Sequence, residues 1–400
     1  MSESLSRLFD DVAPFVIPLL PLDARARAAC TRKAWCAAAS DLSLWAELSF
    51  ENCAVQVTDA TLAALCARAG PALRSLRLDS CACRQMSGAG LVAALSDGRC
   101  AGLQRLYAEL YGRRCELTPA LVAKLVTACQ QLERTECSVV CTRLDDAVQA
   151  VAALPGPLKL RIHSEDGRPA QTASAARGLL HCSVTLLRVQ YCNLVRWDAT
   201  AFGEALRVNN TLTHLCLFDN GIDGGMAWLG EALRVNRTLT YLEIVNNRVG
   251  DDGAAALGVA LRTNNTLKWL ELTACGIGDH GAAALGEALS VNRTLTDLDL
   301  GRNRLGAGGV VALSEALRVN TTLKILNLSD NGTWEDGAAV ALAAALRMNR
   351  SLTMLNLCHN QTFDTVAISL AEALRVNNSL LTLDLGGNGI GDAGAVALCM

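Results

Sequence analysis

The side chains that could do chemistry are scattered along the sequence. The five histidines stand at positions 163, 181, 214, 280 and 359, and they form neither an HExxH zinc motif nor part of a G-x-S-x-G nucleophile elbow. The glycine-rich stretches 301–306 and 386–392 lack the Gly-Lys-Ser or Gly-Lys-Thr of a phosphate loop. The paired acids Asp251 and Asp252 suit the first turn of a helix, where backbone N–H groups are unpaired. We therefore expect no catalytic residue, no metal site and no cofactor, and hence no enzyme.

Cysteine is the other reactive residue type, with seventeen copies. Eleven of them precede residue 142, and none forms the paired CxxC motifs that are spaced for zinc. Cys53, Cys81 and Cys275 occupy positions at which neighbouring segments carry asparagine or cysteine at the end of a strand-like pattern. We expect reduced, mostly buried thiols with a structural role.

The elements that position these side chains repeat along the chain. The pattern Leu212-x-x-Leu215-x-Leu217-x-x-Asn220 recurs with starts at 239, 267, 295, 323, 352 and 380, so the period is 27–29 residues. A fixed period of this size predicts a solenoid. The pattern resembles a leucine-rich repeat, and its length with one helix per unit resembles the ribonuclease-inhibitor-like type. The expected fold is an α/β horseshoe with parallel strands on the concave face and helices on the convex face.

Two asparagines in each repeat have different predicted roles. Asn303 and its equivalents follow the strand, where a buried side-chain amide can pair with backbone groups of neighbouring turns. Asn264 and its equivalents begin Asn-x-Thr or Asn-x-Ser triplets at the repeat boundary. We interpret these triplets as helix ends and turns rather than glycosylation sites, and we expect Asn264 to be exposed.

The N-terminal segment 1–50 has a different pattern and resembles an F-box, which is a compact three-helix motif. The resemblance rests on Leu20-Pro21, on Arg32-x-x-Trp35 and on Leu44-Trp45, in this order and spacing. The sequence departs from the family where Leu8-Phe9 replaces the usual Leu-Pro and where Pro18 interrupts the first helix. The alternative is a helical cap that shields the first strand of the array.

The F-box resemblance implies a partner. Such a module docks on the Skp-type adaptor of a cullin–RING ubiquitin ligase, and the repeats behind it select a substrate. The residues implied to dock on the adaptor, or to support docking, are Leu8, Phe9, Leu20, Pro21, Trp35 and Trp45.

The expected organisation has four parts. An F-box-like helical module covers residues 1–50, and irregular repeats of the cysteine type cover 51–152. An irregular segment or hinge covers 153–178, where Pro155-Gly-Pro157 breaks the pattern. Regular repeats cover 179–400, and the last of them is incomplete.

Composition limits the function classes. The net charge of −3 argues against binding to nucleic acid or to a membrane surface. No apolar run reaches 18 residues, and the N-terminus lacks the basic lead of a signal peptide. We therefore expect a cytoplasmic or nuclear protein that is not secreted.

The outward positions of the strands provide the candidate binding site. Aromatic and acidic residues gather there on three neighbouring repeats: Tyr241, Glu243, Trp269, Glu271, Asp297 and Asp299. Exposed aromatic rings with acids around them favour the binding of a basic segment of a protein. The alternative is that these positions vary freely and bind nothing.

The combined interpretation is a non-catalytic adaptor, with the F-box-like module docking on the ligase and the repeats holding a protein substrate. The rival class is a ligase-independent scaffold or regulator. It would resemble ribonuclease inhibitor, the repeat arrays of innate-immune sensors or the activating protein of the Ran GTPase.

Overall fold

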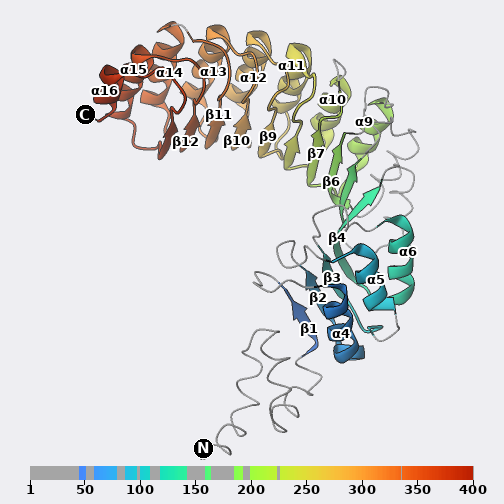
Figure 1. Ribbon diagram of the computed structural model, residues 1–400. Coiled ribbons are helices and arrows are strands. Elements are labelled where there is room, and N and C mark those ends of the chain that lie inside the picture. The colour runs from blue at the N-terminus through green and yellow to red at the C-terminus, as the bar shows by residue number, and fades with distance from the viewer. Residues whose placement is uncertain are drawn as a thin grey trace, which may run out of the picture. The chain divides into compact units, whose positions relative to one another are not determined.

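The computed structural model describes residues 45–50, 58–78, 86–96, 100–108, 118–141, 158–163, 184–191, 199–222, 226–334 and 336–399 (Figure 1). The chain forms two compact units. Unit 1 comprises Met1–Cys141 and Asp146–Arg161, and unit 2 comprises Thr142–Asp145 and Ile162–Met400. Most of the predicted F-box-like segment lies outside the described residues. So does the predicted hinge, except for residues 158–163.

Unit 2 repeats one strand and one helix. Its strands are β6 (Val184–Gln190), β7 (His214–Phe218), β8 (Tyr241–Glu243), β9 (Trp269–Glu271), β10 (Asp297–Asp299), β11 (Ile325–Asn327), β12 (Met354–Asn356) and β13 (Thr382–Asp384). Its helices are α9 (Ala199–Val208), α10 (Ala227–Val235), α11 (Gly250–Leu261), α12 (Asp279–Val291), α13 (Ala307–Val319), α14 (Asp336–Met348), α15 (Asp364–Leu374) and α16 (Asp392–Cys399). From β6 to β13, each strand pairs in parallel with the next.

Unit 1 follows the same plan. Its strands are β1 (Glu47–Ser49), β2 (Ser75–Leu78), β3 (Arg105–Ala108) and β4 (Arg134–Cys141), and each pairs in parallel with the next. Its helices are α4 (Asp59–Ala69), α5 (Gly88–Ser96) and α6 (Pro119–Ala128), with the short 3-10 turn η3 (Gly70–Ala72). A further strand, β5, spans Leu158–His163.

In unit 2 the strands lie along one side and the helices along the other (Figure 1). The central leucine of each three-residue strand from β8 to β11 is buried and its two neighbours are partly exposed. This alternation follows from the period of two along a strand. Leu257 and Leu261 of α11 are buried against the strand layer. The predicted α/β solenoid of parallel strands and helices is confirmed.

The strand-end asparagines form the predicted ladder. Asn303 donates from Nδ2 to the carbonyl oxygen of Leu272 at 2.8 Å, and its Oδ1 accepts from the N–H groups of Cys275 and Ile277. Cys275 replaces asparagine in the preceding repeat, and its thiol donates to the carbonyl oxygen of Ile244. Each rung therefore joins one repeat to the repeat before it.

The prediction that Asn264 is exposed is wrong. Asn264 is 3% exposed, and its equivalents from Asn209 to Asn377 are buried as well. Its Nδ2 donates to the carbonyl oxygen of Leu233, and its Oδ1 accepts from the N–H groups of Thr266 and Leu267. A second asparagine ladder thus runs along the helix ends of unit 2. It forms because the turn after each helix packs against the equivalent turn of the preceding repeat.

Two of the described cysteines of unit 1 stand at the position of this second ladder. Cys100 and Cys129 stand three residues before the first strand leucine, which is the place of Asn264 in unit 2. Cys100 and Cys129 are both buried, and the Cys100 thiol donates to the carbonyl oxygen of Cys66 at 3.7 Å. Burial raises the pKa of Cys129 to about 11. These thiols stay protonated and fill a structural position.

A first-turn aspartate in several repeats caps the helix of the next repeat. Asp279 Oδ1 accepts from the N–H groups of Gly306 and Gly309, at 2.7 and 2.8 Å. Asp251 and Asp364 likewise each accept two hydrogen bonds from glycine N–H groups of the repeat that follows them. A Cβ on Gly309 would lie 2.8 Å from this carboxylate oxygen, so glycine makes room for the aspartate. The cap is shared between repeats.

Two features concern the described residues as a whole. None of their helices is both long and apolar enough to span a lipid bilayer. No group of three or more histidine, cysteine or acidic side chains among them is arranged to hold a metal ion.

Candidate docking surface on the strand face

Three aromatic rings stack across neighbouring strands of unit 2. His214, Tyr241 and Trp269 begin β7, β8 and β9 and are paired in register. The ring centroids of His214 and Tyr241 lie 5.3 Å apart, and those of Tyr241 and Trp269 lie 5.4 Å apart with planes inclined by 19°. The spacing is close to one strand separation. The rings of Tyr241 and Trp269 therefore lie side by side on the strand face.

The rings are not open to water on all sides. Tyr241 and Trp269 are both partly buried because each covers a face of the other. The indole Nε1 of Trp269 is buried, and among the described residues it has no hydrogen-bond partner of normal geometry. The stack is therefore a preformed, half-buried aromatic surface on the strand face.

The next row of the strand face is acidic. Glu243, Glu271 and Asp299 pair in register on β8, β9 and β10, so carboxylates face one another across successive strands. Arg188 of β6 lies 3.8 Å from Glu243 at one end of the row. Asn327 of β11 donates to Asp299 at 2.8 Å at the other end. One end of the row therefore has a cation beside it, and the other end accepts a hydrogen bond from a neutral amide.

Glu271, in the middle of the row, has no cation beside it among the described residues. The hydroxyl of Tyr241 donates to Glu271 Oε2 at 3.4 Å. Burial raises the pKa of the Glu271 carboxyl, as do the nearby charges of Glu243 and Asp299, and the Trp269 indole and the Tyr241 hydroxyl lower it in part. Burial raises the pKa of the Tyr241 hydroxyl, as do the nearby charges of Glu243 and Glu271. A positive charge placed above Glu271 would relieve this repulsion.

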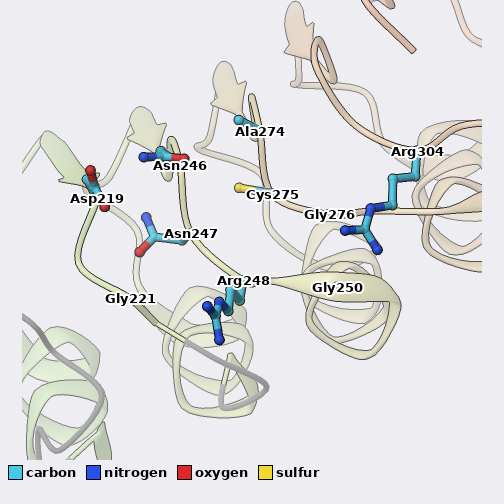
Figure 2. A pocket seen from close by; sticks show the side chains of 10 residues that line it. All are labelled: Asp219, Gly221, Asn246, Asn247, Arg248, Gly250, Ala274, Cys275, Gly276 and Arg304. Carbon is cyan, nitrogen blue, oxygen red and sulfur yellow. The ribbon is translucent and has the colours of Figure 1, made fainter. Parts of the chain in front are cut away.

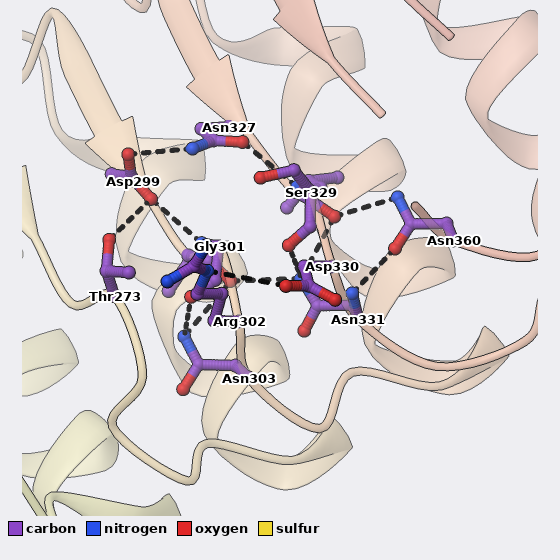
Figure 3. A network of polar contacts seen from close by, with 12 residues as sticks. Thr273, Asp299, Gly301, Arg302, Asn303, Asn327, Ser329, Asp330, Asn331 and Asn360 are labelled. Carbon is purple, nitrogen blue, oxygen red and sulfur yellow. Dashed lines mark hydrogen bonds and ion pairs between the residues drawn. The ribbon is translucent and has the colours of Figure 1, made fainter. Parts of the chain in front are cut away.

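The two aspartates of the predicted site serve mainly within the chain. Asp299 accepts from the Thr273 hydroxyl at 3.0 Å, from the Gly301 N–H at 2.8 Å and from Asn327 (Figure 3). Asp297 accepts from the Thr296 hydroxyl. Asp299 is therefore part of a polar network between repeats, and its carboxylate is less available to a partner than that of Glu271.

The structure brings together four of the six predicted residues on the strand face as one cluster: Tyr241, Glu243, Trp269 and Glu271. Two further members were not predicted. His214 extends the stack, and Arg188 neutralises one end of the acidic row. Residue type and repeat position mark His214 in the sequence, since it stands where Tyr241 and Trp269 stand. Arg188 reaches Glu243 across β7, and no local pattern reveals that contact.

Five of the six predicted adaptor residues, Leu8, Phe9, Leu20, Pro21 and Trp35, lie outside the described residues. Trp45 is described and is 2% exposed. The guanidinium of Arg68, from α4, lies over its ring at 5.1 Å from the centroid. Trp45 therefore packs inside unit 1, and its ring is not exposed on the surface.

Comparison with known proteins addresses the repeats. The family described as Leucine Rich repeat matches residues 235–258, 263–286, 291–314, 319–343 and 376–399. No F-box match was detected. A search of curated protein sequences gives no significant match.

Three solved structures are similar to this chain. A chain of the Rad7–Elc1 complex from yeast shares 15% identity, with 98% of this chain and 92% of that chain covered and a TM-score of 0.53. An internalin from Listeria monocytogenes shares 18% identity over 89% of this chain and 85% of its own, with a TM-score of 0.49. The actin-binding site 2 of leiomodin-1 shares 25% identity over 32% of this chain and 73% of its own, with a TM-score of 0.29.

At 15% identity, the likeness to the yeast chain concerns the fold alone. Together with the matched repeats, it agrees with the parallel strands and alternating helices of unit 2. The C-terminal half of the chain carries leucine-rich repeats and folds as a solenoid.

Proposed function

We propose that this chain is a non-catalytic adaptor that holds a protein partner on the strand face of unit 2. The partner offers a basic segment, and one of its cationic side chains sits above Glu271 and against the ring of Trp269. The uncompensated Glu271 beside a stacked aromatic surface is the observation that carries the proposal.

The chemistry of the cluster favours a cation. Glu271 lies between two other carboxylates. Arg188 lies beside Glu243 and the neutral amide of Asn327 beside Asp299, whereas no described cation lies beside Glu271. An arginine side chain can form charge-assisted hydrogen bonds to a carboxylate and stack on an indole face at the same time. Aromatic anchors of this kind are common among the few residues that dominate binding energy.

A small probe tests the cation site directly. N-acetyl-arginine amide, titrated into the full chain, should shift the indole N–H signal of Trp269 in a 15N NMR spectrum. A dissociation constant on the order of millimolar is expected for a ligand this small. The Trp269→Phe variant assigns the signal, and N-acetyl-glutamate amide is the control of opposite charge. The proposal would be contradicted if the arginine probe left the Trp269 chemical shift unchanged, or if both probes changed it equally.

We further propose that the N-terminal segment docks this adaptor on a cullin–RING ubiquitin ligase. The support is the F-box resemblance of Leu20-Pro21, Trp35 and Leu44-Trp45. In this role, unit 2 would be the substrate receptor.

Binding of the full chain to an Skp-type adaptor tests the ligase role. Substitution of Leu20 and Pro21 by alanine should weaken binding at least about tenfold, which corresponds to about 1.4 kcal/mol. The Trp269→Ala variant is the control and should bind the adaptor unchanged. If the intact chain shows no adaptor binding at micromolar concentration, the ligase role is lost and the ligase-independent scaffold stands in its place.

A further inference from the structure

The turn after β9 is made of unusually small residues. It reads Ala274-Cys275-Gly276, whereas the equivalent turns read Asn246-Asn247-Arg248 one repeat earlier and Arg302-Asn303-Arg304 one repeat later. A cavity of about 870 Å³ opens here, and its walls include the three small residues together with Arg248 and Arg304 (Figure 2). We call this cavity the Gly276 notch.

The two arginines stand in equivalent positions on either side of Gly276. The backbone N–H of Arg248 donates to Ile222 at 2.8 Å, and that of Arg304 donates to Ile277 at 2.8 Å. Gly276, with φ +70°, offers no side chain between them. The two backbones are two repeats apart, or about 10 Å at the strand spacing. Arginine side chains are long enough to converge on one group across that distance.

Neither guanidinium has an ion-pair partner in the part of the chain that the structure describes, and both residues are exposed. The nearby Arg302 differs, because it pairs with Asp330 at 3.3 Å. Two unpaired cations facing one cavity attract an anion, and a guanidinium binds the oxygens of a phosphoryl group in a bidentate manner. Asp219 lines the other end of the cavity (Figure 2). The negative charge of Asp219 repels an anion, so an anion in the cavity binds near the arginines.

The thiol in the notch has a structural role. Cys275 is fully buried, and its thiol donates to the carbonyl oxygen of Ile244. Burial raises its pKa to about 12. Since only the thiolate is a good nucleophile or metal ligand, the chemistry of the notch comes from its arginines.

We propose that the Gly276 notch binds a phosphoryl group carried on a phosphorylated side chain of a protein partner. The cavity is far larger than a phosphate ion and open to solvent, so it accommodates the chain segment that carries the group. The turns that line the notch begin five residues after Tyr241 and Trp269, beyond the ends of β8 and β9, which is roughly 16 Å of extended chain. The notch is distinct from the cation site at Glu271 and does not depend on it.

Titration of the full chain with O-phospho-L-serine and with inorganic phosphate, followed by 31P NMR line broadening, tests the proposal. The Arg248→Ala, Arg304→Ala variant should bind phosphoserine at least about tenfold more weakly. The matched control is Arg237→Ala, Arg293→Ala. It removes two exposed arginines that are also two repeats apart but lie in the turns before the strands rather than after them. It should bind as the wild type does. Thermal unfolding of all variants confirms that they fold.

A third variant keeps both charges and places a side chain between the two arginines. Gly276→Asn should fold, because asparagine tolerates a positive φ, and it should weaken phosphoserine binding. Absence of phosphoserine binding to the wild type, or equal losses in the two double variants, would overturn the site. Inorganic phosphate binding as tightly as phosphoserine would overturn the assignment to a phosphorylated side chain.

Discussion

Asn264 donates from Nδ2 to the carbonyl oxygen of Leu233, 2.7 Å away in the preceding repeat. Its Oδ1 accepts from two backbone N–H groups of its own repeat. One side-chain amide thus ties the end of one helix to the start of the next strand and to the repeat before it. Asn236, Asn292, Asn320, Asn349 and Asn377 repeat these contacts.

We expect Asn264→Ala to lower the free energy of unfolding by roughly 1–3 kcal/mol, because it leaves buried backbone groups unpaired. Asn303→Ala should cost a similar amount at the other ladder. The adjacent Asn265 is exposed, so Asn265→Ala should change stability by less than about 0.5 kcal/mol. Urea unfolding measures all three variants. A loss at Asn264 no greater than at Asn265 would contradict the ladder.

The sequence predicts the helix end at Asn264 but not its burial. The repeat period indicates that the chain turns at this position, between a helix and the next strand, and Asn-x-Thr is typical of such a turn. Burial depends on the Leu233 carbonyl, which lies 31 residues earlier. Only the packing of one repeat on another brings the two together. The same applies to Asp279, which local sequence assigns to its own helix although it caps the next one.

Asp279 and Gly309 should be energetically coupled. Asp279→Ala removes two hydrogen bonds at a helix start and should cost about 0.5–2 kcal/mol. Gly309→Ala should also destabilise the wild type, although alanine favours a helix, because its Cβ would collide with the carboxylate. In the Asp279→Ala background, Gly309→Ala should cost less, because the 2.8 Å contact with the carboxylate oxygen is gone and only the 3.0 Å contact with the Ala282 Cβ and the 3.3 Å contact with the Cα of residue 279 remain. A double-mutant cycle by urea unfolding measures this coupling, and purely additive losses would contradict the shared cap.

The chain itself contains the matching exception. Ala307 stands at the Asp279 position of its repeat, and Ala338 stands at the corresponding glycine position of the next. Both partners of the shared cap are missing there. Asp336 is present at the aspartate position of α14, but Val366 stands at the glycine position of α15, and the Val366 N–H donates to the Phe363 carbonyl oxygen instead. The pairs Asp251 with Gly281 and Asp364 with Gly394 keep both partners.

Stability should depend on the ionisation of Glu271. Its folded-state pKa is raised, so the unfolded chain gives up this proton first as pH increases. The contribution of this group to the free energy of unfolding is therefore fully present below about pH 4.5, and it is lost as pH rises through the folded-state pKa. Glu271→Gln should remove the loss and stabilise the protein near pH 7 by about 0.2–1 kcal/mol, the cost of like charges on adjacent strands.

Urea unfolding at pH 5 and pH 7 measures this effect, with Glu243→Gln as the comparison. Glu243 has Arg188 beside it, so its neutralisation removes an attractive pair and should not stabilise the protein as Glu271→Gln does. A Glu271→Gln variant that is less stable than the wild type at pH 7 would mean that the carboxylate is already compensated.

The candidate site was partly predictable. Strand periodicity places Tyr241, Trp269, Glu243 and Glu271 on one face and in adjacent rows, as the structure shows. The sequence does not reveal which carboxylate is compensated, because that depends on the reach of Arg188 across β7 and on the amide of Asn327. Nor does it reveal the half-buried state of the rings, which arises from their stacking.

The central claim is that a protein partner is held at the aromatic and acidic cluster of the strand face. Quantitative capture of cellular partners by the tagged full chain tests it most directly, with the Tyr241→Ala, Trp269→Ala double variant compared against the wild type. The control is Ile325→Ala, Met354→Ala, which changes the same row of the face on β11 and β12.

We expect Trp269→Ala alone to cost about 2 kcal/mol of binding free energy, or roughly a 30-fold loss of affinity. The double variant should therefore lose the partner that the wild type captures, whereas the control should retain it. Capture of that partner in equal amounts by the wild type and the double variant would contradict the account.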